Sequence, residues 1–300
     1  MISAQFDLPD VIKSPFGAQA TLLRALRPEV IADKYRLKCN VDVLPFFYGI
    51  QQVGLYECLQ TGYRFWRPEE IAGTEEFYHL ISRAWGNYYR SHRWEYSIAR
   101  KYIHSHQSVL EIGCGKGYFL KSLEKTGASC CGLELNHQAI NEKVSKFPVR
   151  RERIEQFAIS NTGKFDVVCS FQVLEHVTDP FAFLENAAIC LAPGGYLITS
   201  TPNRDYQPHV DQSDAFDMPP HHMGHFSVST FQRIESLIQL LLIGNNVEPR
   251  YFQMPPVTPR TQSHAWFRFA HPVMKAVMNL TYRITREPGA NIVAIYQKPT

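Results

Sequence analysis

The sequence predicts an α/β fold built on a parallel sheet with helices on both faces. Between Ser108 and Asn203, short apolar runs alternate with amphipathic runs, as in consecutive strand–helix units. The first apolar run, "SVLEI", leads through the glycine turn "GCGKG" into an expected helix. Glu134 lies at the end of the second apolar run, 21 residues after Gly113. These three observations indicate a doubly wound sheet that binds a ligand at the carboxyl ends of its strands.

The expected elements follow from these alternating runs. After the alternating region come a loop rich in Pro, Asp and His (204–226), a helix (227–244), a strand near 247–255, a helix (264–284) and a final strand (291–299). Within the alternating region we expect strands at 108–113, 128–136, 147–153, 165–173 and 195–203, and helices at 117–127, 137–147 and 181–192.

Residues 1–105 differ in character, and we treat them as an N-terminal extension to the domain of residues 106–300. They are rich in aromatic residues and arginine, and the three- and four-residue spacing over 76–103 favours amphipathic helices. We therefore expect a mostly helical extension that lies on the acceptor side as a lid. Its arginines either pair with a phosphate on the acceptor or are solvated, and they are Arg64, Arg67, Arg90 and Arg93.

Composition limits the class of protein. With 31 basic and 28 acidic residues the formal charge is only +3, which argues against a nucleic-acid partner. The start lacks the layout of a signal peptide, and no apolar run approaches the ~20 residues that cross a bilayer. Seven cysteines without a CxxC pair favour a reduced chain, so we expect a cytoplasmic protein without a transmembrane segment.

The glycine turn and Glu134 indicate a ribose-bearing ligand. The dinucleotide fingerprint needs a third glycine at position 118, where this chain has Tyr118, and no Gly-Lys-Ser/Thr sequence ends the turn as in a phosphate-binding loop. A carboxylate at the position of Glu134 accepts hydrogen bonds from vicinal ribose hydroxyls. The pair thus specifies ribose without requiring phosphates.

Four segments in order, "VLEIGCGKG", "GLELN", "FDVVCSFQVLEHVTDP" and "LAPGGYLITSTPN", resemble the successive motifs of class I S-adenosylmethionine-dependent methyltransferases. The resemblance is to the branch with the ubiquinone-type O-methyltransferases and the sugar and natural-product methyltransferases. It covers 106–205, and more weakly extends to about 250. It implies a Rossmann-like sheet of seven strands whose last strand, at 291–299, is antiparallel.

The resemblance also implies S-adenosyl-L-methionine as cofactor and a role for each matching residue. Gly113 and Gly115 leave room for the methionine part, and Glu111 beneath the turn orients its amino group. Glu134 holds the ribose. The other expected cofactor-binding residues are Gly117 in the turn and Leu135 beside the adenine, with Ile154, Glu152 or Arg153 nearest the adenine edge. Phe171 and Gln172 should face the amino group and the methyl.

Methyl transfer to a hydroxyl benefits from a base, and histidine is the side chain that titrates near neutral pH. The candidates, in order of preference, are His222, His221 and His176, of which His176 has a structural reading as a residue that holds its loop in place. The HHxxH spacing of His221, His222 and His225 is typical of zinc helices, but Pro219-Pro220 and Gly224 argue against a helix. Some relatives carry an acid at position 172 that is suggested to bind a divalent ion with the Glu-His pair, whereas this chain has Gln172. We therefore predict no metal.

The leading hypothesis is an enzyme that methylates a small molecule, at oxygen, on a sugar, a lipid precursor or a specialised metabolite. One alternative is a non-catalytic module that keeps the cofactor as a sensor or scaffold. Another is a nicotinamide oxidoreductase on the same sheet, against which Tyr118 argues. The sequence specifies neither the acceptor nor the oligomeric state.

Overall fold

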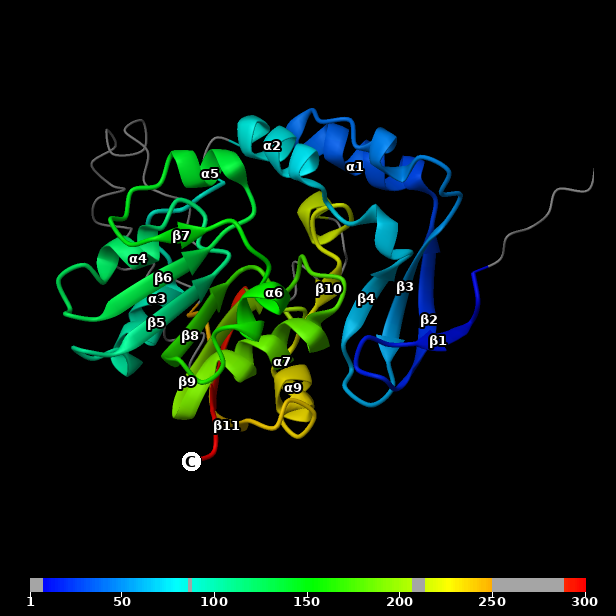
Figure 1. Cartoon of the computed structure of the whole chain (residues 1–300). Coiled ribbons are helices and arrows are strands. Elements are labelled where there is room, and N and C mark those ends of the chain that lie inside the picture. Colours follow the sequence, from blue (N-terminus) through cyan, green and yellow to red (C-terminus); the bar gives the residue numbers. More distant parts are fainter. Residues whose placement is uncertain (1–7, 86–87, 207–213, 250–288) are drawn as a thin grey trace, which may run out of the picture.

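The computed structural model describes residues 8–85, 88–206, 214–249 and 289–300. In these residues the chain forms two sheets that lie side by side, with helices covering both (Figure 1). One sheet is formed by the alternating region together with two later strands, and the other is formed mainly by the N-terminal extension.

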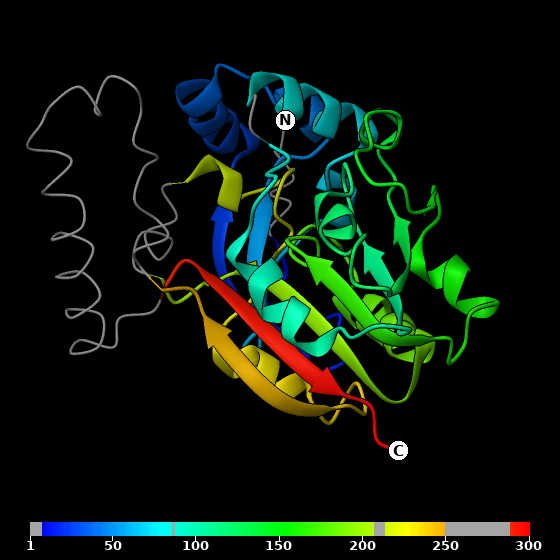
Figure 2. The same ribbon diagram turned by 90° about the vertical axis from the view of Figure 1, so that its left-hand side faces the viewer.

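The larger sheet has seven strands in the order β11-β12-β9-β8-β5-β6-β7. All neighbouring pairs from β9 to β7 are parallel, and β12 is antiparallel to both of its neighbours (Figure 2). The expected doubly wound sheet with an antiparallel last strand is therefore confirmed. Its strands are β5 (Ser108–Ile112), β6 (Ser129–Leu133), β7 (Val149–Arg150), β8 (Phe165–Phe171), β9 (Leu191–Pro202), β11 (Leu241–Val247) and β12 (Asn291–Gln297).

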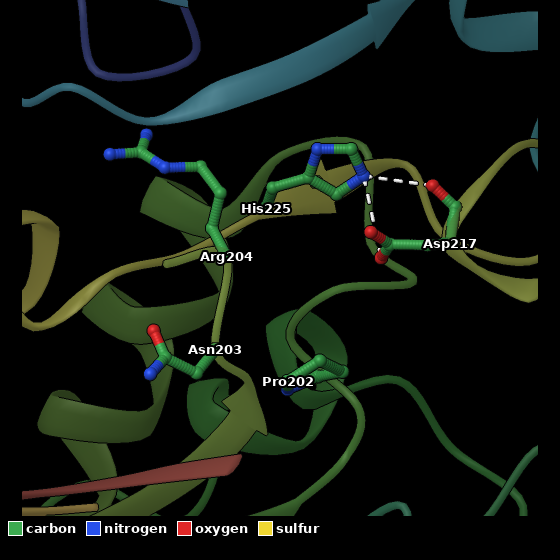
Figure 3. A pocket seen from close by; sticks show the side chains of 6 residues that line it. Pro202, Asn203, Arg204, Asp217 and His225 are labelled. Carbon is green, nitrogen blue, oxygen red and sulfur yellow. Dashed lines mark hydrogen bonds and ion pairs between the residues drawn. The ribbon is translucent and has the colours of Figure 1, made fainter. Parts of the chain in front are cut away.

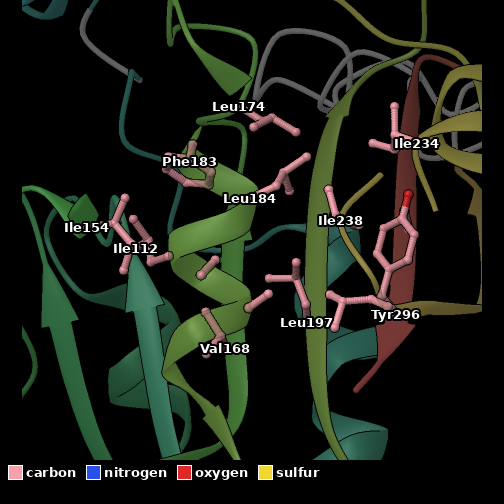
Figure 4. Packing of buried hydrophobic residues seen from close by; sticks show 14 of the residues in the cluster. Ile112, Ile154, Val168, Leu174, Phe183, Leu184, Leu197, Ile234, Ile238 and Tyr296 are labelled. Atoms are coloured by element: carbon pink, nitrogen blue, oxygen red, sulfur yellow. The ribbon is translucent and has the colours of Figure 1, made fainter. Parts of the chain in front are cut away.

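Both faces of this sheet are buried. Successive residues of a strand point to opposite faces, so Leu110 and Val109 enter different apolar clusters. One cluster contains Leu197 and Tyr296 and packs against α6, α7 and α9 (Figure 4). The other packs against α3 and α4. The helices are α3 (Trp94–Ala99), α4 (Tyr118–Ser122), α5 (His137–Asn141), α6 (Ile154–Ile159), α7 (Pro180–Cys190) and α9 (Val228–Ile234), with 3-10 turns η3 (Arg100–Tyr102) and η4 (Ala215–Asp217).

Local sequence signals set the helix starts. The Asp179 carboxylate accepts a hydrogen bond from the backbone N–H of Ala182 (2.9 Å), and Pro180 occupies the first turn of α7. The Ser227 hydroxyl accepts from the backbone N–H of Thr230 (3.1 Å) at the start of α9. These caps hold two helices on the same face of the sheet.

The N-terminal extension contains a sheet that the sequence analysis did not predict, beside the helices that it did. The sheet is antiparallel in the order β1-β2-β3-β4-β10, and a third apolar cluster packs against it. Its last strand comes from the loop after β9, because Gly224 pairs with Phe65 and His225 with Arg64. The elements are β1 (Val11–Lys13), β2 (Gln19–Leu26), α1 (Pro28–Cys39), η1 (Leu44–Phe47), β3 (Val53–Cys58), β4 (Arg64–Arg67), η2 (Glu69–Ile71), α2 (Glu75–Ala84) and β10 (Gly224–His225).

The structure differs from the sequence prediction in the segment that follows the loop 204–226. The predicted helix over 227–244 was too long, because α9 ends at Ile234 and β11 begins at Leu241, ahead of the strand expected near 247–255. The continuous apolar run in this region fits either a helix or a buried strand, and Gln239 adopts a positive φ of 55° that ends the helical path. The expected helix over 264–284 lies outside the described residues. In the part of the chain that the structure describes, no helix has the length and apolar character to cross a membrane.

Candidate functional site

The glycine turn lies at the carboxyl end of the central strand β5. The backbone N–H groups of Gly113 and Cys114 both donate to the carbonyl of Leu133, which ties the turn to β6 (2.8 and 2.9 Å). Gly113 and Gly115 adopt φ values of 71° and 54°, a region that residues with a side chain rarely enter. A Cβ at Gly115 would lie 2.8 Å from the ring of Tyr89. The turn thus places main-chain atoms without side chains at the edge of the sheet where ligands of this fold class bind.

Glu134 is joined directly to this turn. Its carboxylate accepts hydrogen bonds from the backbone N–H of Gly115 (2.7 Å), Leu135 (2.8 Å) and Asn136 (2.8 Å). Burial raises the pKa of Glu134, and the three backbone donors oppose that rise. The two features that the sequence analysis combined by spacing therefore form one hydrogen-bonded unit.

Glu111 lies beneath the turn on β5. Its side chain is buried, and Oε2 has no hydrogen-bond partner among the described residues. Burial raises the pKa of Glu111 well above its ordinary value, with Glu134 adding to the rise and Arg93 opposing it. A buried carboxylate oxygen without a partner is costly, so a cationic ligand group here fits the residues present.

Arg93, which precedes α3, is one of the four arginines for which the sequence analysis weighed pairing with an acceptor phosphate against exposure to solvent. Its charge lowers the pKa of both Glu111 and Glu175, so it lies near the carboxylates of this edge of the sheet.

The other expected cofactor residues divide between the rim and the core. Leu135 is 45% exposed, as expected for a residue that flanks a ligand, whereas Ile154 is buried in the core at the start of α6. The ring of Phe171 packs against Phe119 (4.8 Å between centroids). Gln172 has a positive φ of 55° and donates its amide to Glu95 (3.2 Å). A non-glycine residue in this region often marks a functional position.

Three histidines converge beyond the end of β8. One ring nitrogen from each of His176, His221 and His222 lies within 4.8 Å of the others. His176 follows β8, whereas His221 and His222 come from the loop before β10. The structure therefore joins the three predicted catalytic candidates in one cluster. His225, which completes the HHxxH spacing, is not part of it.

Asp217, which sequence reasoning missed, holds two of the loop histidines. The Nδ1 of His222 lies 3.1 Å from the carboxylate of Asp217, and both side chains are buried. The Nε2 of His225 donates to the backbone carbonyl of Asp217 (2.9 Å) and lies 3.5 Å from its carboxylate (Figure 3). A cavity of about 10 Å³, the size of one water molecule, separates this pair from Arg204. The Asp217–His222 contact fixes the imidazole with its proton on Nδ1.

His176 and His221 have weaker basicity. The Nδ1 of His176 donates to the carbonyl of His221 (2.6 Å), and burial lowers the pKa of His176 to about 4. The Nδ1 of His221 donates to the carbonyl of Phe216 (2.9 Å), its Nε2 lies 3.2 Å from the hydroxyl of Tyr88, and burial lowers its pKa well below the ordinary value. Both rings are therefore neutral near pH 7.

The N-terminal extension reaches this cluster. Tyr78 on α2 donates to the carbonyl of His221 (3.4 Å), and its ring lies edge-on to His176 (5.6 Å between centroids). Tyr88 follows α2 and contacts the His221 ring. Aromatic side chains of the extension thus pack directly against the cluster.

Comparison with known proteins identifies the family. The family model described as a methyltransferase domain matches residues 85–241, just over half of the chain. The chain belongs to the methyltransferase domain family. A solved S-adenosylmethionine-dependent methyltransferase from Archaeoglobus fulgidus has the same fold, with a TM-score of 0.50, 18% identity, and coverage of 75% of this chain and 95% of that one. The sheet is thus that of the class I methyltransferases, whose cofactor is S-adenosylmethionine.

Two ubiquinone biosynthesis O-methyltransferases are similar in sequence to this methyltransferase. The one from Vibrio parahaemolyticus is 32% identical over 111 residues, which are 35% of this chain and 47% of the relative. The one from Alkalilimnicola ehrlichii is 27% identical over 203 residues, 63% of this chain and 72% of the relative. The chain spans about half the length of the first relative that it matches.

Proposed function

We propose that this methyltransferase transfers the methyl group of S-adenosylmethionine to a hydroxyl oxygen of a small-molecule acceptor. The observation that carries the proposal is the hydrogen bond between Glu134 and Gly115, which makes a ribose-binding carboxylate and a bare backbone turn one unit. The imidazole cluster beyond β8, at the same edge of the larger sheet, supplies a base. The described residues of the extension close the acceptor side.

In this proposal the turn and the two carboxylates hold the cofactor. Gly113, Gly115 and Gly117 present backbone to the methionine part, and the oxygen of Glu111 that has no partner among the described residues attracts the amino group. Glu134 accepts from the ribose hydroxyls. Leu135 and Ile154 lie toward the adenine, and Phe171 and Gln172 lie toward the amino group and the methyl.

We assign the base to His222. S-adenosylmethionine bound at the glycine turn would supply a methyl group on a sulfonium leaving group, and the acceptor oxygen would take the methyl in line with that leaving group. The acceptor hydroxyl would give its proton to Nε2 of His222. Asp217 holds Nδ1 protonated and stabilises the imidazolium that forms. His176, with a pKa of about 4, is too weak a base near neutral pH.

The acceptor class rests on the relatives. Two similar proteins are named ubiquinone biosynthesis O-methyltransferases, which supports oxygen as the nucleophile and a small molecule as acceptor. A sugar, a lipid precursor or a specialised metabolite all provide such a hydroxyl. The seven free cysteines support a reducing compartment, and we place the enzyme in the cytoplasm.

Replacement of His222 tests the assignment. We expect His222→Ala to lower single-turnover methyl transfer by ~100-fold or more while the affinity for S-adenosylhomocysteine stays unchanged, because the base acts only on the acceptor. His104→Ala, at an exposed histidine, is the matched control and should keep full turnover. Unchanged turnover in His222→Ala would remove this residue as base. Cofactor binding without transfer to any acceptor in the unsubstituted chain would instead favour the non-catalytic module.

A further inference from the structure

Tyr89 brings the N-terminal extension onto the glycine turn. A Cβ placed on Gly115 would lie 2.8 Å from Cδ1 and 3.0 Å from Cε1 of the Tyr89 ring, so the ring lies directly against the main chain of the turn. The ammonium of Lys116, the next residue of the turn, lies 5.8 Å from the centroid of the same ring. Tyr89 therefore belongs to the extension by sequence and to the candidate cofactor site by position.

Asn136 determines how the Tyr89 hydroxyl is used. The Oδ1 of Asn136 accepts hydrogen bonds from the backbone N–H groups of Gln138 (2.9 Å) and Ala139 (3.3 Å), which caps the start of α5. The Nδ2 of Asn136 therefore faces Tyr89 and donates to its hydroxyl oxygen (3.0 Å). A phenol that accepts one hydrogen bond still has its own proton to donate. Tyr89 thus offers a hydrogen-bond donor beside the glycine turn.

Glu134 provides the complementary acceptor. Its carboxylate accepts from the backbone N–H groups of Gly115 (2.7 Å) and Asn136 (2.8 Å), the two residues that Tyr89 contacts. Burial raises the pKa of Tyr89 and the charge of Glu134 adds to the rise, so the phenol keeps its proton at neutral pH. A carboxylate and a phenol side by side suit a ribose, because its hydroxyls both donate and accept hydrogen bonds.

We propose that Tyr89 binds the ribose of S-adenosylmethionine, with its hydroxyl donating to a ribose oxygen while Glu134 accepts from the ribose hydroxyls. The inference rests on the proposed function and adds to it, because the other residues placed at the cofactor all belong to the domain of residues 106–300. The extension then contributes to the cofactor side of the site as well as to the acceptor side.

The neighbours of Tyr89 connect it with the histidine cluster. The Tyr88 hydroxyl lies 3.2 Å from Nε2 of His221, and the rings of Tyr88 and Tyr89 meet edge-on with 5.1 Å between centroids. Trp85 packs edge-on against Phe216 in the turn η4 (4.7 Å between centroids). A ligand favours the arrangement in which it makes more contacts. Cofactor that fixes Tyr89 therefore also holds the residues that pack on the histidine cluster.

The variant Tyr89→Phe tests the ribose contact, because it removes the hydroxyl and keeps the ring. We expect the affinity for S-adenosylhomocysteine to fall by about 3- to 10-fold, the effect of one hydrogen bond. The affinity for 5′-methylthioadenosine, which has the ribose and lacks the amino-acid part, should fall by the same factor. Tyr48→Phe, at a tyrosine that is 95% exposed, is the matched control and should bind both ligands like the unsubstituted chain. Isothermal titration calorimetry measures these affinities.

Hydrogen exchange tests the connection with the histidine cluster. Bound S-adenosylhomocysteine should slow amide exchange in residues 214–226 of the unsubstituted chain, because Trp85 and Tyr88 are held against them. In Tyr89→Ala at a saturating ligand concentration, the protection of β5 and β6 should remain and that of residues 214–226 should be lost. Equal protection of residues 214–226 in both proteins would contradict the connection.

The calorimetry separates failure of this proposal from failure of the proposed function. Undiminished binding of both ligands by Tyr89→Phe would overturn the ribose contact. Weaker binding of S-adenosylhomocysteine with unchanged binding of 5′-methylthioadenosine would also overturn it, because the hydroxyl would then act on the amino-acid part. If the unsubstituted chain binds no S-adenosylhomocysteine, the proposed cofactor site itself is wrong. Circular dichroism establishes that each variant is folded.

Discussion

Glu111 is the residue whose ionisation is linked most directly to the cofactor. Burial raises its pKa well above the ordinary value of 4.5. Above pH 4.5 the folded free chain therefore keeps a proton that the unfolded chain has lost, and the stability of the free chain falls as the pH rises toward the raised pKa. A bound cation favours the ionised carboxylate, so cofactor binding releases this proton.

This linkage predicts a pH dependence of cofactor affinity. We expect the affinity for S-adenosylmethionine to increase between about pH 5.5 and about pH 8, since less work is needed to ionise Glu111 at higher pH. Glu111→Gln should bind more weakly at the upper end and lose most of the increase. Isothermal titration calorimetry at both pH values measures how the affinity for S-adenosylmethionine changes with pH in each protein. An equal change in the unsubstituted chain and in Glu111→Gln would contradict the role of Glu111.

Single residues of the site differ in how far the sequence reveals them. Gly113, Gly115 and Glu134 could be predicted because one strand–turn–helix unit and the next strand end fix their relative positions. Asp217 could not be predicted, because only the turn η4 brings its carboxylate to the ring of His222. The same holds for the contact between His176 and His221, which joins two distant segments.

At the scale of the elements, the turn between β5 and α4 depends on Gly115. An alanine there must adopt a left-handed conformation, which costs about 1–2 kcal/mol, and its Cβ would lie 2.8 Å from the Tyr89 ring. We expect Gly115→Ala to lower the free energy of unfolding by at least about 1 kcal/mol and to weaken cofactor binding. Urea denaturation and calorimetry measure the two effects.

A double variant separates the two causes. In Gly115→Ala/Tyr89→Ala the contact with the ring is absent and only the backbone strain remains, so the loss from Gly115→Ala should be smaller in the Tyr89→Ala background than in the unsubstituted chain. An equal loss in both backgrounds would assign the whole effect to the backbone.

The two sheets show which elements a sequence reveals. The strands β5, β6 and β8 could be predicted because each is a largely buried run that a helix follows along the chain. The N-terminal sheet was missed because its strands lack that alternation and because β4 pairs with β10, which lies far away along the chain. The end of α9 was missed because the apolar run that follows it suits a helix and a strand equally.

In the whole molecule, the site lies where the two sheets meet. The strand β10 extends the N-terminal sheet, while the residues just before it carry two of the clustered histidines toward the larger sheet. Helix α2 lies beside α5 at the top of both sheets (Figure 1), where Glu75 pairs with Arg151 (2.7 Å). Both partners of this ion pair are half exposed, and such pairs contribute ~0–1 kcal/mol. Buried contacts therefore hold the extension in place more than this pair does.

Binding of S-adenosylmethionine at the glycine turn is the central claim, and ligand-dependent unfolding tests it most directly. S-adenosylhomocysteine at 100 times its dissociation constant should stabilise the folded chain by about 2.7 kcal/mol, and the midpoint of thermal unfolding should rise with its concentration. NAD at the same concentration should leave the midpoint unchanged, because Tyr118 occupies the position of the third fingerprint glycine. A rise with NAD and none with S-adenosylhomocysteine would contradict the account.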